Sequence, residues 1–158
     1  MSFNWIAERP RHPHPQGVDT ESTRRATTPI VESRERRALL MLMAEYFAWL
    51  GYTDIKARLP GYPAPSMLSG TLEDHRPDLT CRQSDSRQTP LILEVVPLSE
   101  LADPRLEHRW TLLFSAARLY GAELHFCVPR WSQAGASDLR LRQCLERLDI
   151  RSNRIWTV

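Results

Sequence analysis

Two carboxylates, Asp78 and Glu94, stand in segments whose other residues are those of buried strands. The segments RPDLTC and LILEVVP are short and apolar, and a polar turn joins them. Side chains alternate across a strand, so Asp78 can lie beside Glu94 if the two strands pair. Two close acids repel and are costly to bury, and a divalent cation removes that cost. Mg²⁺ prefers oxygen ligands and can activate water for attack on a phosphate, so the pair predicts a site for Mg²⁺ or Mn²⁺.

A purely structural interpretation of the same acids stays open. Asp78 could cap a turn at the end of its strand, and Glu94 could pair with an arginine such as Arg76 or Arg109. Pro77 directly before Asp78 and the apolar setting of Glu94 favour the functional interpretation.

Other candidate chemical groups carry less information. His75 adjoins the first acidic strand and could assist a metal or a phosphate, but it is better explained as a turn histidine. The pair His12-Pro-His14 could bind a metal, but an incidental polar segment explains it better. Glu107-His108 lacks the second histidine of a zinc-protease helix. The three cysteines, Cys81, Cys127 and Cys144, are not clustered, which is typical of free thiols in a reducing compartment.

Periodicity and capping signals predict the elements that must position the acids. A helix opens at Ser33 and stops at Gly51, and Asp103-Pro104 starts a second helix that ends at Gly121. Leu39 to Leu50 is apolar nearly all round, so the first helix is expected to be largely buried. The remaining predicted elements are strands at 52–60, 76–82, 91–97, 123–129 and 154–158 and an amphipathic helix at 137–148.

The predicted order is therefore α-β-β-β-α-β-α-β. The strand, helix and strand from residue 91 to 129 imply a right-handed parallel crossover, and the three earlier strands imply an antiparallel meander. We expect an α/β fold with a mixed central sheet flanked by helices on both faces. Residues 1–32, rich in proline and arginine, are expected to form an irregular arm before a single domain at 33–158.

Composition sets limits on the class of protein. The chain has 158 residues, of which 42% are hydrophobic and 25% charged, as in ordinary globular domains. The segment MSFNWIAERP lacks the layout of a secretory signal, and no apolar run is long enough to span a bilayer, so we expect a cytoplasmic protein without a membrane partner. The net charge of +2 is too small to indicate nucleic-acid binding by itself. Nearly all of the positive charge is arginine, and Lys56 is the only lysine.

Pro77-Asp78, the hairpin and Glu94 resemble the motif of the PD-(D/E)XK nuclease superfamily, whose restriction-endonuclease-like core has the order αβββαβ. More narrowly, the stretch from Ser33 to about Pro129 is similar to the catalytic domain of the TnsA endonuclease subunits of heteromeric transposases. The matching features are the Ser-x-Glu opening of the first helix, the strand DIKARLPG, the Pro-Asp strand and the segment EVVPLSELADPR.

The resemblance implies a set of site residues. Asp78 and Glu94 would be the principal metal ligands, the backbone carbonyl of Val95 a further ligand, and Glu35 the helix glutamate that reaches the metal. The family's motif places a lysine at position 96, where it orients the attacking water and neutralises charge on the phosphate. This chain has Val96 instead, and valine can do neither.

Three interpretations of Val96 remain open. The chain is a catalytically silent relative, or a cation from elsewhere replaces the lysine, or the metal alone supports slow hydrolysis. Lys56 is the first candidate for a substitute cation, with Arg109 or Arg105 as others. Loss of one positioned acid–base group typically costs about 10²–10⁴-fold in rate, so the third interpretation predicts feeble activity.

The resemblance also implies function and partners. The first hypothesis is a DNA-interacting protein with Mg²⁺-dependent phosphodiester hydrolysis through Asp78, Glu94 and Glu35, working with a transposase and a DNA-targeting ATPase. The alternative is a non-enzymatic adaptor that keeps the fold as a scaffold for DNA or for a transposase or repair partner.

Overall fold

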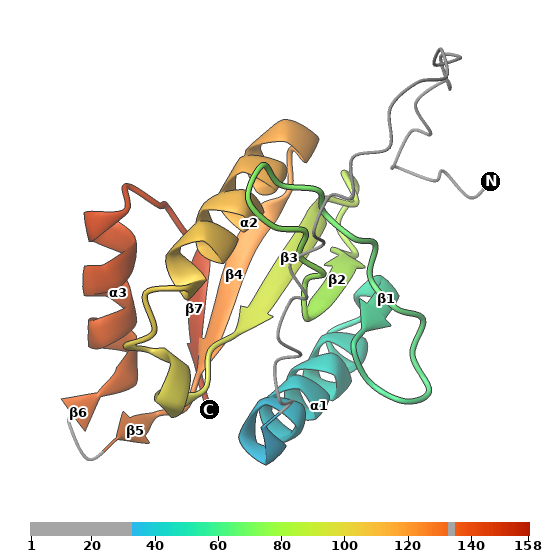
Figure 1. Ribbon diagram of the computed structural model, residues 1–158. Helices are drawn as coiled ribbons and strands as arrows, with labels where there is room; N and C mark the ends of the chain where they lie inside the picture. Colours follow the sequence, from blue (N-terminus) through green and yellow to red (C-terminus); the bar gives the residue numbers. More distant parts are fainter. Residues whose placement is uncertain (1–32, 133–134) are drawn as a thin grey trace, which may run out of the picture. The chain divides into compact units, whose positions relative to one another are not determined.

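The computed structural model describes residues 33–132 and 135–158 (Figure 1). The compact unit that they belong to runs from Glu32 to Val158. The predicted arm at 1–32 and its histidines, His12 and His14, lie outside the described residues.

A five-stranded mixed sheet forms the centre of the unit, in the order β1-β2-β3-β4-β7. β1, β2 and β3 are antiparallel neighbours, whereas β3, β4 and β7 run parallel. The predicted meander and parallel crossover are therefore confirmed. The strand bounds are β1 Thr53–Ala57, β2 Leu79–Arg82, β3 Pro90–Val95, β4 Glu123–Val128 and β7 Arg154–Thr157.

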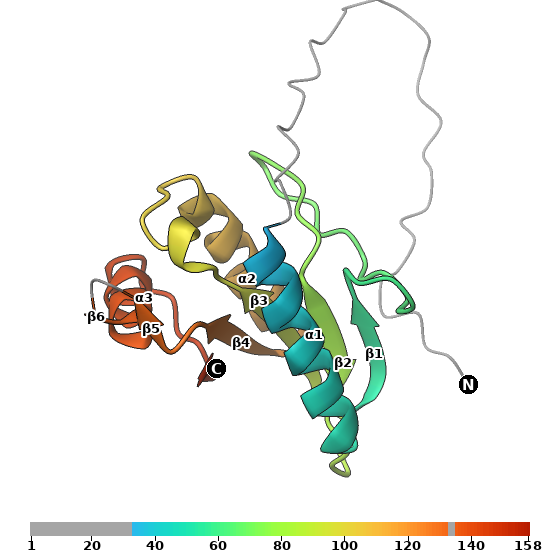
Figure 2. The same cartoon turned by 90° about the horizontal axis from the view of Figure 1, so that it is seen from below.

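Three helices cover the two faces of this sheet, as expected for an α/β fold (Figure 1, Figure 2). α1, Arg34–Trp49, packs on one face, and α2, Leu106–Tyr120, with α3, Ser137–Arg147, packs on the other. The alternation of β3 divides its side chains between two cores. Leu91, Leu93 and Val95 face the α1 core, and Ile92 and Val96 face the core under α2 and α3.

Local sequence signals explain most of the helix boundaries. Ser33 caps α1, because its Oγ accepts the backbone N–H of Arg36 at 3.1 Å. Gly51, just past the end of α1, has a φ of 83°, and Gly121 closes α2 with a φ of 62° in the left-handed region. α2 begins at Leu106, two residues later than predicted, because Asp103 caps a turn by accepting the N–H of Arg105.

Two short features were not predicted. The 3₁₀ helix η1, Leu98–Glu100, follows β3 and carries Glu100 toward the site described below. The small ribbon of β5, Trp131–Ser132, and β6, Gly135–Ala136, precedes α3. The three cysteines are free thiols, as expected, with Cys81 and Cys127 buried. None of the helices in the described part of the chain is both long and apolar enough to cross a bilayer.

Candidate functional site

The two acids of the sequence motif converge at one end of the antiparallel pair β2–β3. Leu79 pairs with Leu93, so continuing this register places Asp78 opposite Glu94, on the same side of the sheet. Both carboxylates are almost completely buried, and Oδ2 of Asp78 accepts the backbone N–H of Val95 at 2.9 Å. The predicted pairing of the two acidic strands is therefore confirmed.

A buried arginine, Arg36 on the first turn of α1, lies against both acids. Its Nη1 donates to Oδ2 of Asp78 and lies 3.8 Å from Oε1 of Glu94. Its Nη2 donates to Oε2 of Glu100, which η1 brings to the same guanidinium. One permanently charged side chain thus joins three carboxylates that come from separate segments of the chain.

Further polar groups surround the acids. Nε2 of His75 lies 3.2 Å from both oxygens of Glu94, with its hydrogen bond directed to Oε2. The bridge between Leu68 and His75 fixes this histidine through two backbone hydrogen bonds, so it is not a simple turn residue. Nη1 of Arg58 lies 3.5 Å from Oδ1 of Asp78.

Burial and neighbouring charges act in opposite directions on the two acids. Burial and the charge of Glu94 raise the pKa of Asp78, and Arg36, the Val95 N–H and Arg58 oppose that rise. Burial by itself would also raise the pKa of Glu94, but His75, Arg36 and Arg109 outweigh it and lower that pKa below its usual range. One acid of the pair therefore favours the proton and the other favours the charge, as two close carboxylates require.

Burial and the neighbouring carboxylates also act on the pKa of the Arg36 guanidinium. Burial disfavours its charged form, but Asp78, Glu94 and Glu100 outweigh this and raise the pKa of Arg36 further. Arg36 is therefore charged at every physiological pH, and it supplies the positive charge that the sequence motif led us to expect from a metal ion.

Glu35, which the resemblance places at the metal site, is not joined to the acid cluster, and its role as a metal-site residue stays a prediction. It precedes Arg36 on α1, and a rotation of about 100° per residue turns it away from the direction in which Arg36 points. The side chain of Glu35 makes no hydrogen bond or ion pair with another residue within 33–132 or 135–158. Glu100 is the third carboxylate of the cluster in its stead.

The sequence contained a signal for Arg36 that the motif-based interpretation missed. The buried residues of α1 are Arg36, Leu40, Met43, Ala44 and Phe47, which share one helical face. An arginine that continues an apolar i, i+4, i+7 face is expected to be buried and paired. Arg58 also escaped notice, although the β1–β2 register places it opposite Asp78, with its backbone N–H donating to the Asp78 carbonyl at 2.9 Å.

Lys56 lies farther along β1, opposite Thr80, and its Nζ is 3.7 Å from Oδ1 of Asp54. Its role as a substitute cation stays a prediction, and Arg58 is the β1-side cation that the structure places beside Asp78. Of the other arginines considered, Arg109 acts on the pKa of Glu94, whereas Arg105 is paired with Asp103.

Val95 and Val96 have different roles around the acid pair: Val95 contacts Asp78 through its backbone, whereas Val96 is part of an apolar core. The amide of Val95 holds Asp78, while its side chain is buried in the α1 core. Whether its carbonyl binds a metal stays a prediction. Val96 is 1% exposed and belongs to the core under α2 and α3, so a lysine side chain at this position would enter an apolar cluster.

A divalent metal fits this arrangement poorly. Asp78, Glu94 and Glu100 offer the oxygen ligands that Mg²⁺ prefers. Within the described ranges, however, no group of three or more His, Cys, Asp or Glu side chains is arranged to hold an ion. Arg36 binds the carboxylates that would be the ligands, and its charge opposes that of an incoming cation. Oε1 of Glu94 is the one carboxylate oxygen here that is buried without a hydrogen-bond partner.

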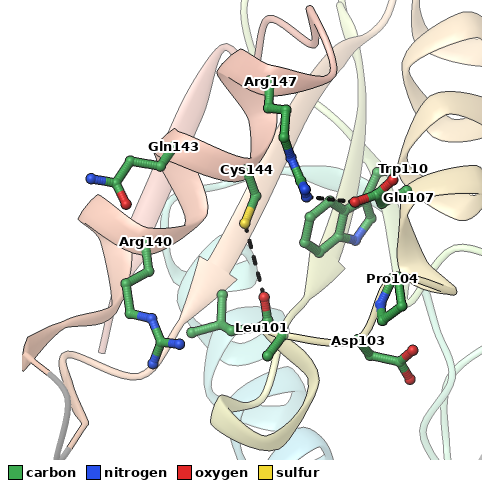
Figure 3. A pocket seen from close by; sticks show the side chains of 10 residues that line it. Leu101, Asp103, Pro104, Glu107, Trp110, Arg140, Gln143, Cys144 and Arg147 are labelled. Atoms are coloured by element: carbon green, nitrogen blue, oxygen red, sulfur yellow. Dashed lines mark hydrogen bonds and ion pairs between the residues drawn. The ribbon is translucent and has the colours of Figure 1, made fainter.

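A separate cleft of about 430 Å³ lies between α2 and α3, next to the loop that follows η1 (Figure 3). Arg140, Gln143 and Arg147 line it from α3, while Glu107 and Trp110 line it from α2. Arg147 donates to Oε1 of Glu107 across the cleft. Arg140 has no ion pair with another described residue, so its charge is available to a ligand.

Comparisons of the chain with models of known protein families, with curated proteins and with solved structures found no significant match.

Proposed function

We propose that this chain is a non-enzymatic DNA-binding protein with a restriction-endonuclease-like fold. The observation that carries the proposal is the contact of one buried guanidinium, that of Arg36, with Asp78, Glu94 and Glu100. An arginine in this position pairs with the acids permanently, and its positive charge opposes the binding of Mg²⁺. The silent interpretation of the nuclease motif is therefore favoured over hydrolysis.

Two further observations support this proposal. The order of elements from α1 to β4, with three antiparallel strands followed by a helix and a parallel strand, is the αβββαβ order of the resemblance. Val96, in place of the motif lysine, is enclosed by apolar side chains and has become part of a core. The absence of the motif lysine thus has a structural compensation in apolar packing.

The cleft between α2 and α3 is where we propose that DNA binds. Arg140 and the amide of Gln143 lie on one face of α3, at a spacing of three residues, and both line the cleft. Arginine suits phosphate oxygens because its planar fork donates two parallel hydrogen bonds. A backbone phosphate at Arg140 would give binding without base preference. A transposase subunit, which the sequence resemblance implies, is the protein partner that we propose.

A nuclease assay combined with a metal titration tests the loss of catalysis. Supercoiled plasmid is incubated with Mg²⁺ or Mn²⁺ and the full chain, with Asp78→Ala as the matched control. We expect equal background cleavage by both proteins, and no shift in the melting temperature of the wild type on addition of Mn²⁺. Cleavage by the wild type that Asp78→Ala abolishes would overturn the proposal.

A binding titration tests the DNA contact. We expect Arg140→Ala to weaken binding to duplex DNA equally for unrelated sequences, and to lower the slope of log affinity against log salt by about 1. Arg118→Ala, which removes an exposed arginine at the far end of α2, is the control and should leave the slope unchanged. Equal losses in the two variants, or no binding by the wild type at low salt, would exclude the cleft.

Metal-dependent hydrolysis is the second candidate function, and one observation favours it. Oε1 of Glu94 is buried beside Asp78 without a hydrogen-bond partner, so it could accept a cation. By the resemblance, Asp78, Glu94 and the Val95 carbonyl would hold Mg²⁺, which supplies an activated water when it is bound. Arg36 would first have to leave both acids before the metal could bind. Metal binding by the wild type therefore distinguishes hydrolysis from the non-enzymatic function.

A further inference from the structure

The outward face of α1 exposes large apolar side chains, although the helix already buries its opposite face in the core. Leu40, Met43, Ala44 and Phe47 are enclosed by the sheet. On the other side Met41 is 45% exposed, Leu42 50% and Trp49 78%. The expectation that this helix is largely buried is therefore met on one face only, and no other described helix or strand covers the second face (Figure 2).

An exposed apolar helix face of this kind indicates an interface. The residues that form it, called the outer stripe below, are Arg34, Arg37, Ala38, Met41, Leu42, Glu45, Ala48 and Trp49. Tyr46, 38% exposed, borders the stripe and stacks on Trp49 with ring centroids 5.9 Å apart.

Charge is arranged symmetrically along the outer stripe. Arg37, Met41 and Glu45 follow one another at a spacing of four residues, so they lie in one row. Arg37 and Glu45 are equally distant from Met41 and carry opposite charges. A second α1 laid antiparallel across Met41 therefore places each Arg37 against Glu45 of the other copy.

We infer that the outer stripe is the interface of a two-fold symmetric homodimer, with the axis passing by Met41. Two-fold interfaces must be self-complementary, and this stripe supplies both signs of charge at matching distances from its centre. In the same register Arg34 of one copy lies level with Ala48 and next to Trp49 of the other copy, where a cation–π contact can form. Antiparallel helices also oppose their dipoles.

This inference is independent of the proposed DNA contact, because α1 and the α2–α3 cleft lie on opposite faces of the sheet. Sedimentation of the full chain over a range of concentrations is the first test. We expect a dimer, which Met41→Glu converts to a monomer with an unchanged circular dichroism spectrum. Leu119→Glu, at a position 76% exposed near the end of α2, should leave the dimer intact. A monomeric wild type, or a dimer that Met41→Glu does not weaken, would overturn the inference.

Charge exchange tests the register. Arg37→Glu or Glu45→Arg alone creates like charges at both ends of the interface, and each is expected to weaken the dimer by about 10-fold or more. The double exchange restores opposite charges and should recover most of the affinity. Additive losses in the double variant would contradict the antiparallel register.

Cross-linking provides a second test of the register in a Cys144→Ser background, because Cys81 and Cys127 are buried. Met41→Cys should form an intermolecular disulfide on oxidation, since the two copies of residue 41 meet at the axis. Arg37→Cys should not, because eight residues of helical rise separate its two copies by about 12 Å. Faster cross-linking at position 37 than at position 41 would refute the proposed axis.

Discussion

Nη1 of Arg36 donates to Oδ2 of Asp78, and so ties the first turn of α1 to the residue that precedes β2. The same carboxylate oxygen accepts the amide of Val95, and the same guanidinium reaches Glu100 through its second nitrogen. The pair thus connects helix, sheet and the 3₁₀ turn at one buried point. It converts a motif that resembles a metal site into an ion-pair network.

Removing the guanidinium of Arg36 should destabilise the folded protein, because the buried acids need a positive charge beside them. Arg36→Ala leaves Asp78, Glu94 and Glu100 without their shared partner, and we expect a loss of about 3–5 kcal/mol in the free energy of unfolding. If the freed oxygens can then gather a cation, Mn²⁺ should restore part of this stability in the variant and none in the wild type. Chemical denaturation with and without Mn²⁺ measures both effects.

Arg87→Ala is the control for that experiment, because Arg87 is an exposed arginine in the turn between β2 and β3, away from the buried acids and from the outer stripe. Its stability should change by less than about 0.5 kcal/mol and should not respond to Mn²⁺. An Arg36→Ala protein as stable as the wild type would show that the network contributes little to folding.

Restoring the motif lysine should not restore a nuclease. Val96 is packed with Leu101 and Leu106, so Val96→Lys places an amine in an apolar cluster and should cost several kcal/mol in the free energy of unfolding. Val96→Met, which keeps the site apolar, should cost less than about 3 kcal/mol. Plasmid cleavage by a folded Val96→Lys protein with Mg²⁺ would instead show that the acids can hold a metal beside Arg36.

The burial of His125 predicts that the folded protein loses stability on mild acidification. Burial lowers the pKa of His125 from its usual 6.5, while Glu123 partly opposes this shift. The geometry agrees, because Nδ1 accepts the indole N–H of Trp156 at 3.2 Å and must be unprotonated to do so. Arg154, the remaining charged group that acts on this ring, also disfavours its protonation.

The direction of this pH dependence follows from the number of protons that the folded and unfolded states bind at His125. Below pH 6.5 the unfolded chain binds a proton at His125 that the folded chain refuses, so stability is fully present above that pH and falls as the pH drops toward the lowered pKa. The slope from this group is at most about 1.4 kcal/mol per pH unit. Urea denaturation between about pH 5 and 8 should show that His125→Gln loses less stability toward acid pH than the wild type does. An identical pH profile in both proteins would contradict this assignment.

The cysteines should differ sharply in reactivity. Burial, with smaller effects of Asp54 and Asp78 respectively, raises the pKa of Cys81 and of Cys127 to about 12. Cys144 is only half-buried, at the α2–α3 cleft (Figure 3). A thiol reagent at pH 8 should therefore label Cys144 in the folded protein, and the other two only after unfolding. Labelling that a Cys144→Ser substitution leaves unchanged would contradict this order.

Much of the architecture could be predicted from local signals. The cap at Ser33, the stops at Gly51 and Gly121 and the apolar runs of β3 and β4 each depend on residues close in sequence, so the order of elements could be inferred correctly. The register of β2 and β3 was predicted only on the condition that the two strands pair, because alternation fixes which side chains are buried but a shift of two residues would bury the same ones.

The partner of the acids could not be predicted in the same way. The motif directed attention to Glu35, whereas the helical phase of α1 points Arg36 at the sheet. Glu100 and His75 reach the cluster from a 3₁₀ turn and from an isolated bridge, and neither leaves a clear sequence signal. Resemblance to a motif gives the identity of residues, but their phase around a helix depends on which face the core accepts.

The sequence by itself determined that each acid stands in a short apolar strand and that the two acids can meet if these strands pair, since strand alternation is a local rule. Only the tertiary structure decided which positive charge meets them. Buried carboxylates are satisfied by whichever cation the packing brings within a few ångströms, and here the packing of α1 brings an arginine.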